Sequence, residues 1–315
     1  MSRFPPLDLS RIRPTSLAGR QSKVGFQHLG RPFTAGGSFG SFLDTLPDIL
    51  AAAELKDLAS RWAEALRHQR TIILAMGAHP IKVGLSPVII DLMERGAISL
   101  LALNGAGVIH DSELALAGHT SEDVAAVLGS GNFGMSEDTQ LFLNAALRRA
   151  AAEEMGMGEA VGRALLEAAP HRQLSLLASA ARMSIPVTVH VAIGTDTVHI
   201  HPQADGAAIG QASLRDFRTF ASAVATLEGG VYINLGSAVL LPEVFLKALT
   251  LARNIGHKVN DFTAVNMDFM SHYRPLTNVV RRPTANGGKG INLIGHHEIM
   301  LPLLAAAVKE LSGRE

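Results

Sequence analysis

The 315-residue chain contains no cysteine, and its charges cancel. The missing thiols exclude disulfides, thiolate metal ligands and cysteine nucleophiles together. Charged residues make up only 18% of the chain, with 28 Lys and Arg against 28 Asp and Glu. Without an excess of positive charge there is no general electrostatic attraction to nucleic acid or to an anionic membrane. We therefore expect a small-molecule ligand, and neither nucleic acid nor a membrane as a partner.

Long apolar runs are also missing. No segment has the uninterrupted apolar length that a membrane span needs. The N-terminus is broken by Arg3, Pro5 and Pro6, which is unlike the apolar core of a signal peptide. Together with the absence of cysteine, these features predict a cytoplasmic protein.

The first 40 residues differ in composition from the rest of the chain. Residues 1–40 carry six basic residues against one acidic residue, Asp8, and they end in a glycine-rich stretch at 35–40. We expect an irregular N-terminal arm over residues 1–40, either packed on the body or on a neighbouring subunit, or frayed. No linker divides the remainder, so residues 41–315 are predicted to form a single domain.

Short β-branched or leucine-rich runs alternate with longer helical stretches from residue 71 onward. This alternation predicts an α/β fold of the Rossmann-like, doubly wound type, with a mainly parallel sheet and helices on both faces. A helical block rich in Ala, Leu, Glu and Arg is expected over residues 121–184. The expected strands are residues 71–76, 98–103, 186–193, 230–235 and 262–267.

Small, turn-forming residues follow four of these strands, at residues 77–80, 104–107, 194–196 and 236–237. The carboxyl ends of strands border the ligand crevice of an open α/β sheet, and glycine there lets backbone amides approach a phosphate. One such turn is commonplace, but four favour a nucleotide or dinucleotide cleft. A formal G-x-G-x-x-G at residues 129–134 follows an expected helix, so we interpret it as a helix-terminating loop.

Several histidines are candidates for chemistry. His199 and His201 would lie on one face of an extended segment, because strand side chains alternate with a period of two. With His296, His297 or Glu298 they are candidate ligands of a metal, although no known hydrolase spacing is present. Orienting a substrate or completing a buried hydrogen-bond network is the alternative role, and we predict no metal.

Two further groups of basic residues stand out. Lys82 is a candidate for imine formation if its pKa is lowered by burial, and an ordinary surface lysine otherwise. Arg281 and Arg282 lie near the glycine-rich residues 286–290 and suit a bidentate clamp on a carboxylate or phosphate. A solvated turn or a subunit contact is the alternative for this pair.

The order of motifs over residues 70–308 resembles the deoxyhypusine synthase family. The loop at 77–86 and the segment 104–108 are similar to the family's serine-rich loop and its Ala-Gly-Gly-Val segment. Residues 185–196, 235–239 and 300–304 resemble its Ile-Pro-Val strand ending in Thr-Asp-Gly, its Leu-Gly-Gly-Gly-Val turn and its C-terminal helix. The resemblance implies a Rossmann-like fold, NAD as cofactor and a homotetramer.

Two departures from the family's pattern concern its chemistry. The family's glycine turn runs into Lys-His-His, which supplies a catalytic base, whereas residues 240–243 here read Leu-Leu-Pro-Glu. The family's nucleophilic lysine lies in a Trp-Gly-Lys stretch, whereas residues 278–282 here read Asn-Val-Val-Arg-Arg. Arginine stays protonated and cannot form an imine, and Lys289 lies several residues away. The sequence therefore predicts an NAD-dependent, transferase-like enzyme acting on a different small amine- or acid-bearing substrate.

Each candidate residue is assigned a role under this hypothesis. Imidazole titrates near neutral pH, so histidines are the acid and base candidates, and the arginine pair would hold an anionic group of the substrate. Three alternatives stay open: a metal-dependent hydrolase using His199 and His201, a nucleotide-binding protein without catalysis, and a true deoxyhypusine synthase using Lys82 or Lys289. The predicted catalytic residues are His110, His199 and His201, the cofactor-binding residues are Asn104, Gly105, Gly107, Asp111, Gly194, Thr195, Asp196, Gly236 and Ser237, and the substrate-binding residues are Arg281 and Arg282.

Overall fold

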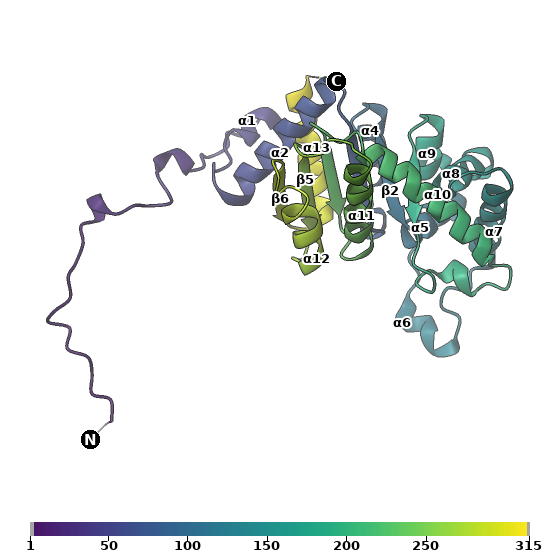
Figure 1. The fold of residues 1–315 in the computed structure, drawn as a ribbon, viewed down its shortest axis with the longest axis horizontal. Helices are drawn as coiled ribbons and strands as arrows, with labels where there is room; N and C mark the ends of the chain where they lie inside the picture. The colour runs from purple at the N-terminus through teal and green to yellow at the C-terminus, as the bar shows by residue number, and fades with distance from the viewer. Residues whose placement is uncertain (1–2, 314–315) are drawn as a thin grey trace.

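A six-stranded, entirely parallel sheet forms the centre of the protein, which a computed structural model describes over residues 3–313. The strand order is β3-β2-β1-β4-β5-β6, so the chain winds outward from β1 in one direction and then outward from β4 in the other. This confirms the predicted Rossmann-like, doubly wound α/β fold (Figure 1). The strands are β1 (Ile72–Met76), β2 (Leu100–Asn104), β3 (Val187–His190), β4 (Val231–Leu235), β5 (Thr263–Asp268) and β6 (Lys289–Ile294).

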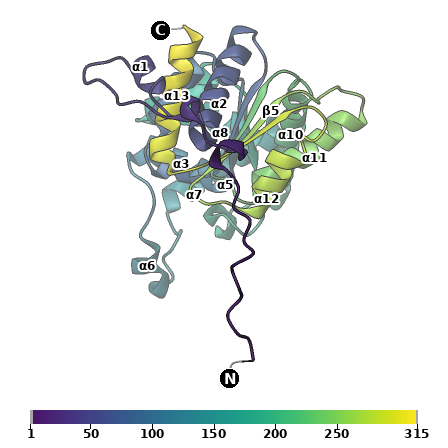
Figure 2. The ribbon, with the colours of Figure 1, turned by 90° about the vertical axis from the view of Figure 1, so that its left-hand side faces the viewer.

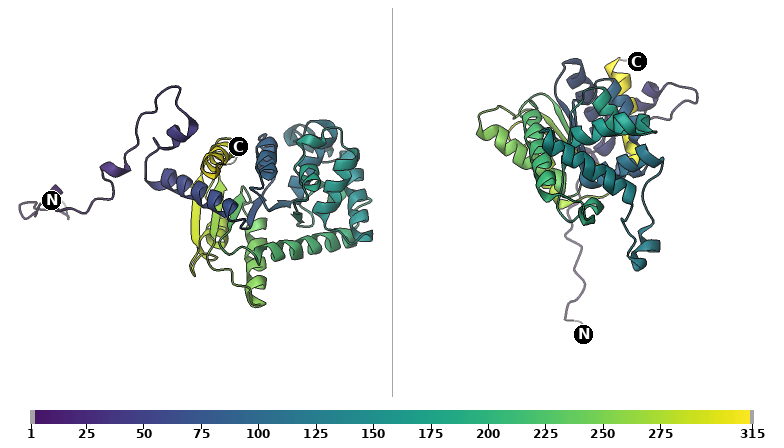
Figure 3. Two further views of the ribbon diagram at one scale, coloured as in Figure 1. Left: turned by 90° about the horizontal axis from the view of Figure 1, so that it is seen from above. Right: turned by 90° about the vertical axis from the view of Figure 1, so that its right-hand side faces the viewer.

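Helices cover both faces of the sheet, as the view from above shows (Figure 3). A parallel sheet buried on both faces needs strands that are apolar throughout, which is why the strands are continuous Ile, Leu, Val and Ala runs. One face packs against α2 (Leu50–Arg67), α4 (Ser86–Glu94), α5 (Gly105–Ala117), α9 (Leu176–Arg182) and α13 (His297–Ser312). The other packs against α10 (Gly206–Val224), α11 (Leu240–Asn254) and the π-helical turn η6 (Leu276–Arg281).

The sixth strand, β6, was not predicted. It lies at one edge of the sheet and pairs only with β5 in the described sheet. Only Ile291 and Leu293 of its six residues are buried, so β6 lacks the continuous apolar run of an inner strand. The glycines before it favour a loop in the sequence, whereas pairing with β5 makes the segment a strand.

The predicted helical block between β2 and β3 is confirmed as a series of short helices. The segment around α6 projects away from the body in Figures 1 and 2. The formal G-x-G-x-x-G follows helical turns, as expected, because Gly131 has a φ of +77° and ends η3. The block consists of α6 (Val124–Val127), η3 (Leu128–Ser130), α7 (Glu137–Ala152), α8 (Met157–Ala168), η4 (Arg172–Leu174) and α9.

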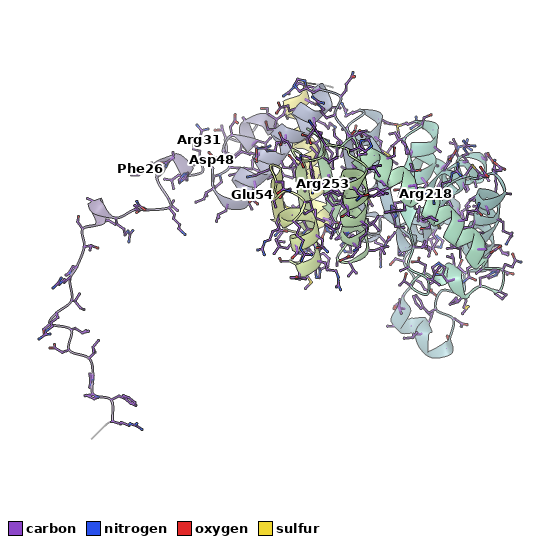
Figure 4. The ribbon with its side chains drawn as sticks, in the orientation of Figure 1. Phe26, Arg31, Asp48, Glu54, Arg218 and Arg253 are labelled. Atoms are coloured by element: carbon purple, nitrogen blue, oxygen red, sulfur yellow. The ribbon has the colours of Figure 1, made fainter. Side chains whose placement is uncertain are left out.

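The N-terminal segment extends away from the body (Figures 1 and 2). Within residues 3–38, which precede α1 (Phe39–Leu43), the regular elements are the 3-10 turns η1 (Leu17–Gly19) and η2 (Phe26–His28). The Phe26 side chain is 93% exposed, and Figure 4 shows it well outside the body. Backbone hydrogen bonds join this segment to later residues at His28, which accepts from the Asp48 amide, and at Arg31, whose amide donates to Thr45. Within residues 3–313, no helix combines the length and apolar character needed to cross a membrane.

Candidate active site at the carboxyl edge of the sheet

The carboxyl ends of β1 and β4 meet at the point where the winding of the sheet changes direction. In open α/β sheets the ligand crevice lies at this switch point, because the loops after the two strands diverge to opposite faces. Here β1 leads into Gly77 and the short helix α3 (His79–Lys82), and β4 leads into Gly236 and Ser237. These are two of the four glycine turns predicted from the sequence.

The N-terminus of α5 is built around a buried carboxylate. The Asn104 side chain caps this helix by accepting a hydrogen bond from the Gly107 amide at 2.9 Å. The carboxylate of Asp196 packs directly on Gly105, and a Cβ atom at position 105 would overlap its Oδ2 atom. Asp196 is 7% exposed, and its burial raises the pKa of the carboxyl although His199 opposes the shift. Gly105 therefore makes room for Asp196.

A cavity of about 190 Å³ opens beside this carboxylate. Three predicted residues, His110, Thr195 and Asp196, line it together with Lys82. His110 Nδ1 lies 2.7 Å from the Thr120 hydroxyl, which in turn donates to Glu113. Burial would raise the pKa of Glu113, but the interactions with His110 and Thr120 hold it below its usual value. The other residues lining the cavity include the carboxylates of Glu113 and Glu122.

A second cluster, which the sequence did not predict, joins three loops of the same edge. His79 from α3 and His297 from the start of α13 approach with their Nδ1 atoms 2.8 Å apart. The Nε2 atom of His297 lies 3.7 Å from Oδ1 of Asp268, the last residue of β5. Phe269 packs on both imidazoles, with ring centroids 5.4 Å from His79 and 5.8 Å from His297. We call these four residues the histidine cluster.

His297 is fully buried. Burial lowers the pKa of its imidazole and the nearby His79 lowers it further, whereas Asp268 acts in the opposite direction. Gly236 has a φ of +67°, and a Cβ atom there would lie 2.6 Å from Cε1 of His297. The glycine turn after β4 is therefore what lets the imidazole pack under the switch point.

Two predicted residues serve the packing of helices. Asp111 is completely buried in α5 and accepts hydrogen bonds from the Ser175 hydroxyl and from the Leu176 and Leu177 amides, which caps α9. Its oxygens are engaged inside the protein and do not face the crevice. Ser237 is similarly buried, and its hydroxyl accepts from the Leu241 amide at the start of α11.

The expectation that His199 and His201 lie on one extended segment is wrong. The chain turns into the 3-10 helix η5 (Thr197–Ile200), because Asp196 and His199 form a reciprocal cap at its N-terminus. His199 Nδ1 accepts from the Gly194 amide, and His201 Nδ1 accepts from the Gln203 amide. Each imidazole thus stabilises its own turn. Among the residues that the structure describes, no group of three or more His, Asp or Glu side chains has the arrangement of a metal site.

Arg281 and Arg282 lie near the amino ends of the strands, opposite the carboxyl ends that border the cavity. They end the η6 turn, which returns the chain from the carboxyl end of β5 to the amino end of β6. Arg282 donates to the Asn278 side chain at 2.9 Å. Lys289, the first residue of β6, lies at the same amino edge, 3.9 Å from Asp57 of α2. Neither the arginine pair nor Lys289 is therefore brought to the cavity, whereas Lys82 is.

No protein-family model matches this chain, and no curated protein matches it in sequence. Solved structures do match. The arginine dihydrolase ArgZ from cyanobacteria aligns over 86% of this chain with a TM-score of 0.54 and 15% identity, but the chain spans only 34% of ArgZ. The AgrE complex with ornithine and NAD+ aligns over 85% with a TM-score of 0.51 and 14% identity, and here the chain spans 35% of AgrE.

A protein from Entamoeba histolytica described as a deoxyhypusine synthase matches along nearly its whole length. It aligns over 88% of this chain and 95% of its own, with a TM-score of 0.52 and 12% identity. At this level of identity the likeness shows a shared fold. The deoxyhypusine synthase-like fold predicted from the motif order is confirmed, and it is a fold also present in a protein solved with NAD+.

Proposed function

We propose that this protein is an NAD-dependent enzyme acting on a small amine. The observation that carries the proposal is the buried carboxylate of Asp196, held against the N-terminus of α5 at the edge of a cavity beside the switch point. A carboxylate near the end of a strand is the group that accepts hydrogen bonds from ribose hydroxyls in dinucleotide sites. The fold shared with AgrE, which was solved with ornithine and NAD+, supports both the cofactor and the substrate class.

The residues present fit a dinucleotide in two respects. The cavity of about 190 Å³ is smaller than the ~300 Å³ at which pockets for drug-sized ligands begin, so it suits one nucleoside of the dinucleotide. Asp196 and Glu113 offer carboxylate oxygens to ribose hydroxyls at its wall. NAD supplies hydride acceptance when bound.

Roles follow for the predicted residues. Asn104, Gly105 and Gly107 shape the start of α5, and Gly194 and Thr195 form the exposed rim of the crevice. His110 contacts the bound cofactor, because it lies in the wall of the cavity. His199 acts indirectly, because it holds the turn that presents Asp196.

The substrate class is narrowed by charge. Asp196, Glu113 and Glu122 line the cavity against one lysine, Lys82, and the histidine His110. The arginine pair that would have held an acid lies at the other edge of the sheet. The carboxylates that stay free when the nucleoside is bound attract an ammonium group beside it, whereas a carboxylate of the substrate would find no arginine in this lining. We therefore favour the amine over the acid.

The protein is further proposed to act as a homo-oligomer. Several apolar side chains of the N-terminal arm are exposed: Leu7, Leu9, Ile12 and Phe26. Large apolar side chains exposed repeatedly along one extended segment favour a role for that segment in binding another protein. A second copy of the chain is the partner that we propose for the arm.

Titration calorimetry and thermal unfolding with NAD+, NADH and ATP test the cofactor. We expect NAD+ to bind and to raise the unfolding temperature, because a ligand of the native state stabilises it. A panel of small diamines and amino acids is then screened for NADH formation at 340 nm. Binding of NAD+ without turnover of any amine would favour a non-catalytic nucleotide-binding protein, and absence of NAD+ binding would exclude the proposal.

A further inference from the structure

The histidine cluster joins residues from the loops after β1, β5 and β6 at the switch point of the sheet. His297 is completely buried, yet its Nε2 atom makes no hydrogen bond to any described residue. A buried imidazole nitrogen without a partner is costly unless a nearby charge stabilises its proton. The carboxylate of Asp268, 3.7 Å away and 2% exposed, is that charge.

Electrostatics selects the tautomer of His297. A neutral imidazole has one N–H and one lone pair. A lone pair on Nε2 would face the negative carboxylate of Asp268, whereas an N–H on Nε2 is attracted by it. His297 therefore carries its proton on Nε2, and its Nδ1 atom bears the lone pair.

This tautomer fixes that of His79. The two Nδ1 atoms lie 2.8 Å apart, so one must donate and the other accept. Since Nδ1 of His297 accepts, Nδ1 of His79 donates, and the lone pair of His79 stands on Nε2. His79 is partly exposed, and the structure gives no hydrogen-bond partner for its Nε2 among residues 3–313.

We propose that His79 accepts a proton from the ligand at the switch point and that His297 and Asp268 are positioning residues that hold it in the basic tautomer. The inference rests on the proposed function, because an amine or hydroxyl that gives a hydride to NAD must also lose a proton. The N–H or O–H bond of the ligand breaks, its electron pair stays on the ligand, and the proton bonds to Nε2 of His79. The resulting imidazolium donates through Nδ1 to His297, and Asp268 stabilises the charge behind it.

The residues around His79 and His297 suit this proton transfer. Phe269 packs against both rings and places apolar surface beside them. The titratable groups that act on His297 are His79 from α3, Asp268 from β5 and Glu298 from its own helix, and the backbone of Met267 also favours its protonated form. The neighbouring His296 side chain is 71% exposed and points to Glu298, 3.9 Å away, so it serves as a matched control.

Nuclear magnetic resonance of ¹⁵N-histidine-labelled protein tests the inference without substrate. We expect long-range proton–nitrogen correlations to find His297 protonated on Nε2 and His79 on Nδ1. In Asp268→Asn the Nε2–H form of His297 should lose population, and the pKa of His297 should fall, because the carboxylate of Asp268 acts to raise it. His296→Gln should leave both rings unchanged.

A second variant covers the case in which Asp268→Asn fails to fold. His79→Gln alters a partly exposed residue and should leave the fold and the affinity for NAD+ unchanged, while it removes the limb of the kcat/KM pH profile that reports the base. A His79 protonated on Nε2, or tautomers that do not respond to Asp268→Asn, would overturn the proposed roles of His79, His297 and Asp268. Failure of NAD+ to bind the wild-type protein would instead overturn the proposed function, so the two failures are distinguishable.

Discussion

Gly105 and Asp196 come from the loops after β2 and β3, and they fit so closely that a Cβ atom at position 105 would overlap the Asp196 carboxylate. This contact joins two neighbouring strand ends and holds Asp196 in the wall of the cavity. The pairing also explains why the first residue of α5 is a glycine.

Gly105→Ala should destabilise the protein by about 1–3 kcal/mol, because an inserted methyl group in a packed site forces its neighbours to move. Urea unfolding measures the change. Most of the loss should disappear when Asp196→Ala is added, since the two residues are in contact and their effects are not additive. Gly129→Ala is the control, as nothing lies within 4 Å of its Cβ position. Equal losses in the single and double variants would contradict the pairing.

Asp196→Asn should weaken NAD+ binding by about 10- to 100-fold, because a hydrogen bond to a charged acceptor contributes about 1.5–3 kcal/mol. The free energy of unfolding of the variant should not fall. Burial raises the pKa of this carboxyl and so disfavours its charged form, and an amide removes that cost. Calorimetric titration and urea unfolding of the same preparations measure the two quantities. Asp205→Asn, in the exposed cap of α10, should change neither. An unchanged affinity in Asp196→Asn would remove this residue from the cofactor site.

Asp216→Asn should change how stability depends on pH. Burial raises the pKa of Asp216 to about 7, although the amides of Gly158 and Val189 donate to it. The native state therefore holds this proton at pH values where the unfolded chain has released it. The stabilisation is complete below about pH 4 and is lost as the pH rises to about 7.

Replacing the carboxyl by an amide should reduce the fall in unfolding free energy by up to ~1.4 kcal/mol per pH unit between pH 5 and 7, which corresponds to one proton. Urea unfolding at three pH values gives the slope. Both proteins keep a second contribution of the same sign, because burial raises the pKa of Asp111 to about 6. Parallel slopes in the variant and the wild type would show that Asp216 is charged in the native state.

Deletion of residues 1–24 should lower the association of the chain without lowering the stability of the body. The segment ends before the backbone bonds that tie His28 and Arg31 to later residues. Sedimentation velocity measures the association, and the unfolding midpoint should stay within about 2 °C, since exposed residues away from the core contribute little to stability. An unchanged oligomer would show that other surfaces hold the subunits.

Local pattern predicted much of the fold. Each of the five predicted strands overlaps an observed one, because a run such as residues 72–76 is buried on both faces and must be apolar throughout. The parallel arrangement followed from the helices between them. β6 was missed because only Ile291 and Leu293 are buried, so the pairing that makes it a strand comes from β5.

The candidate site was predicted less completely. Asp196 and His110 do line one cavity, because both follow strand ends that a parallel sheet brings to the same edge. The histidine cluster carried one local signal, His79 directly after the glycine turn of β1. Its partner His297 is 218 positions away, and nothing in the adjacent pair of residues 296–297 says which imidazole points inward.

The sequence by itself determined that the chain forms a parallel, helix-covered sheet with glycine turns along one edge and no thiol chemistry, because these depend on composition and on periods of a few residues. Tertiary structure alone decided which polar groups face that edge. It turned Asp111 inward to cap α9, placed Arg281 and Arg282 at the amino edge, and joined His79 to His297. The physical reason is that the role of a side chain depends on the groups it contacts. In this fold those groups come from strand ends that are far away in the sequence.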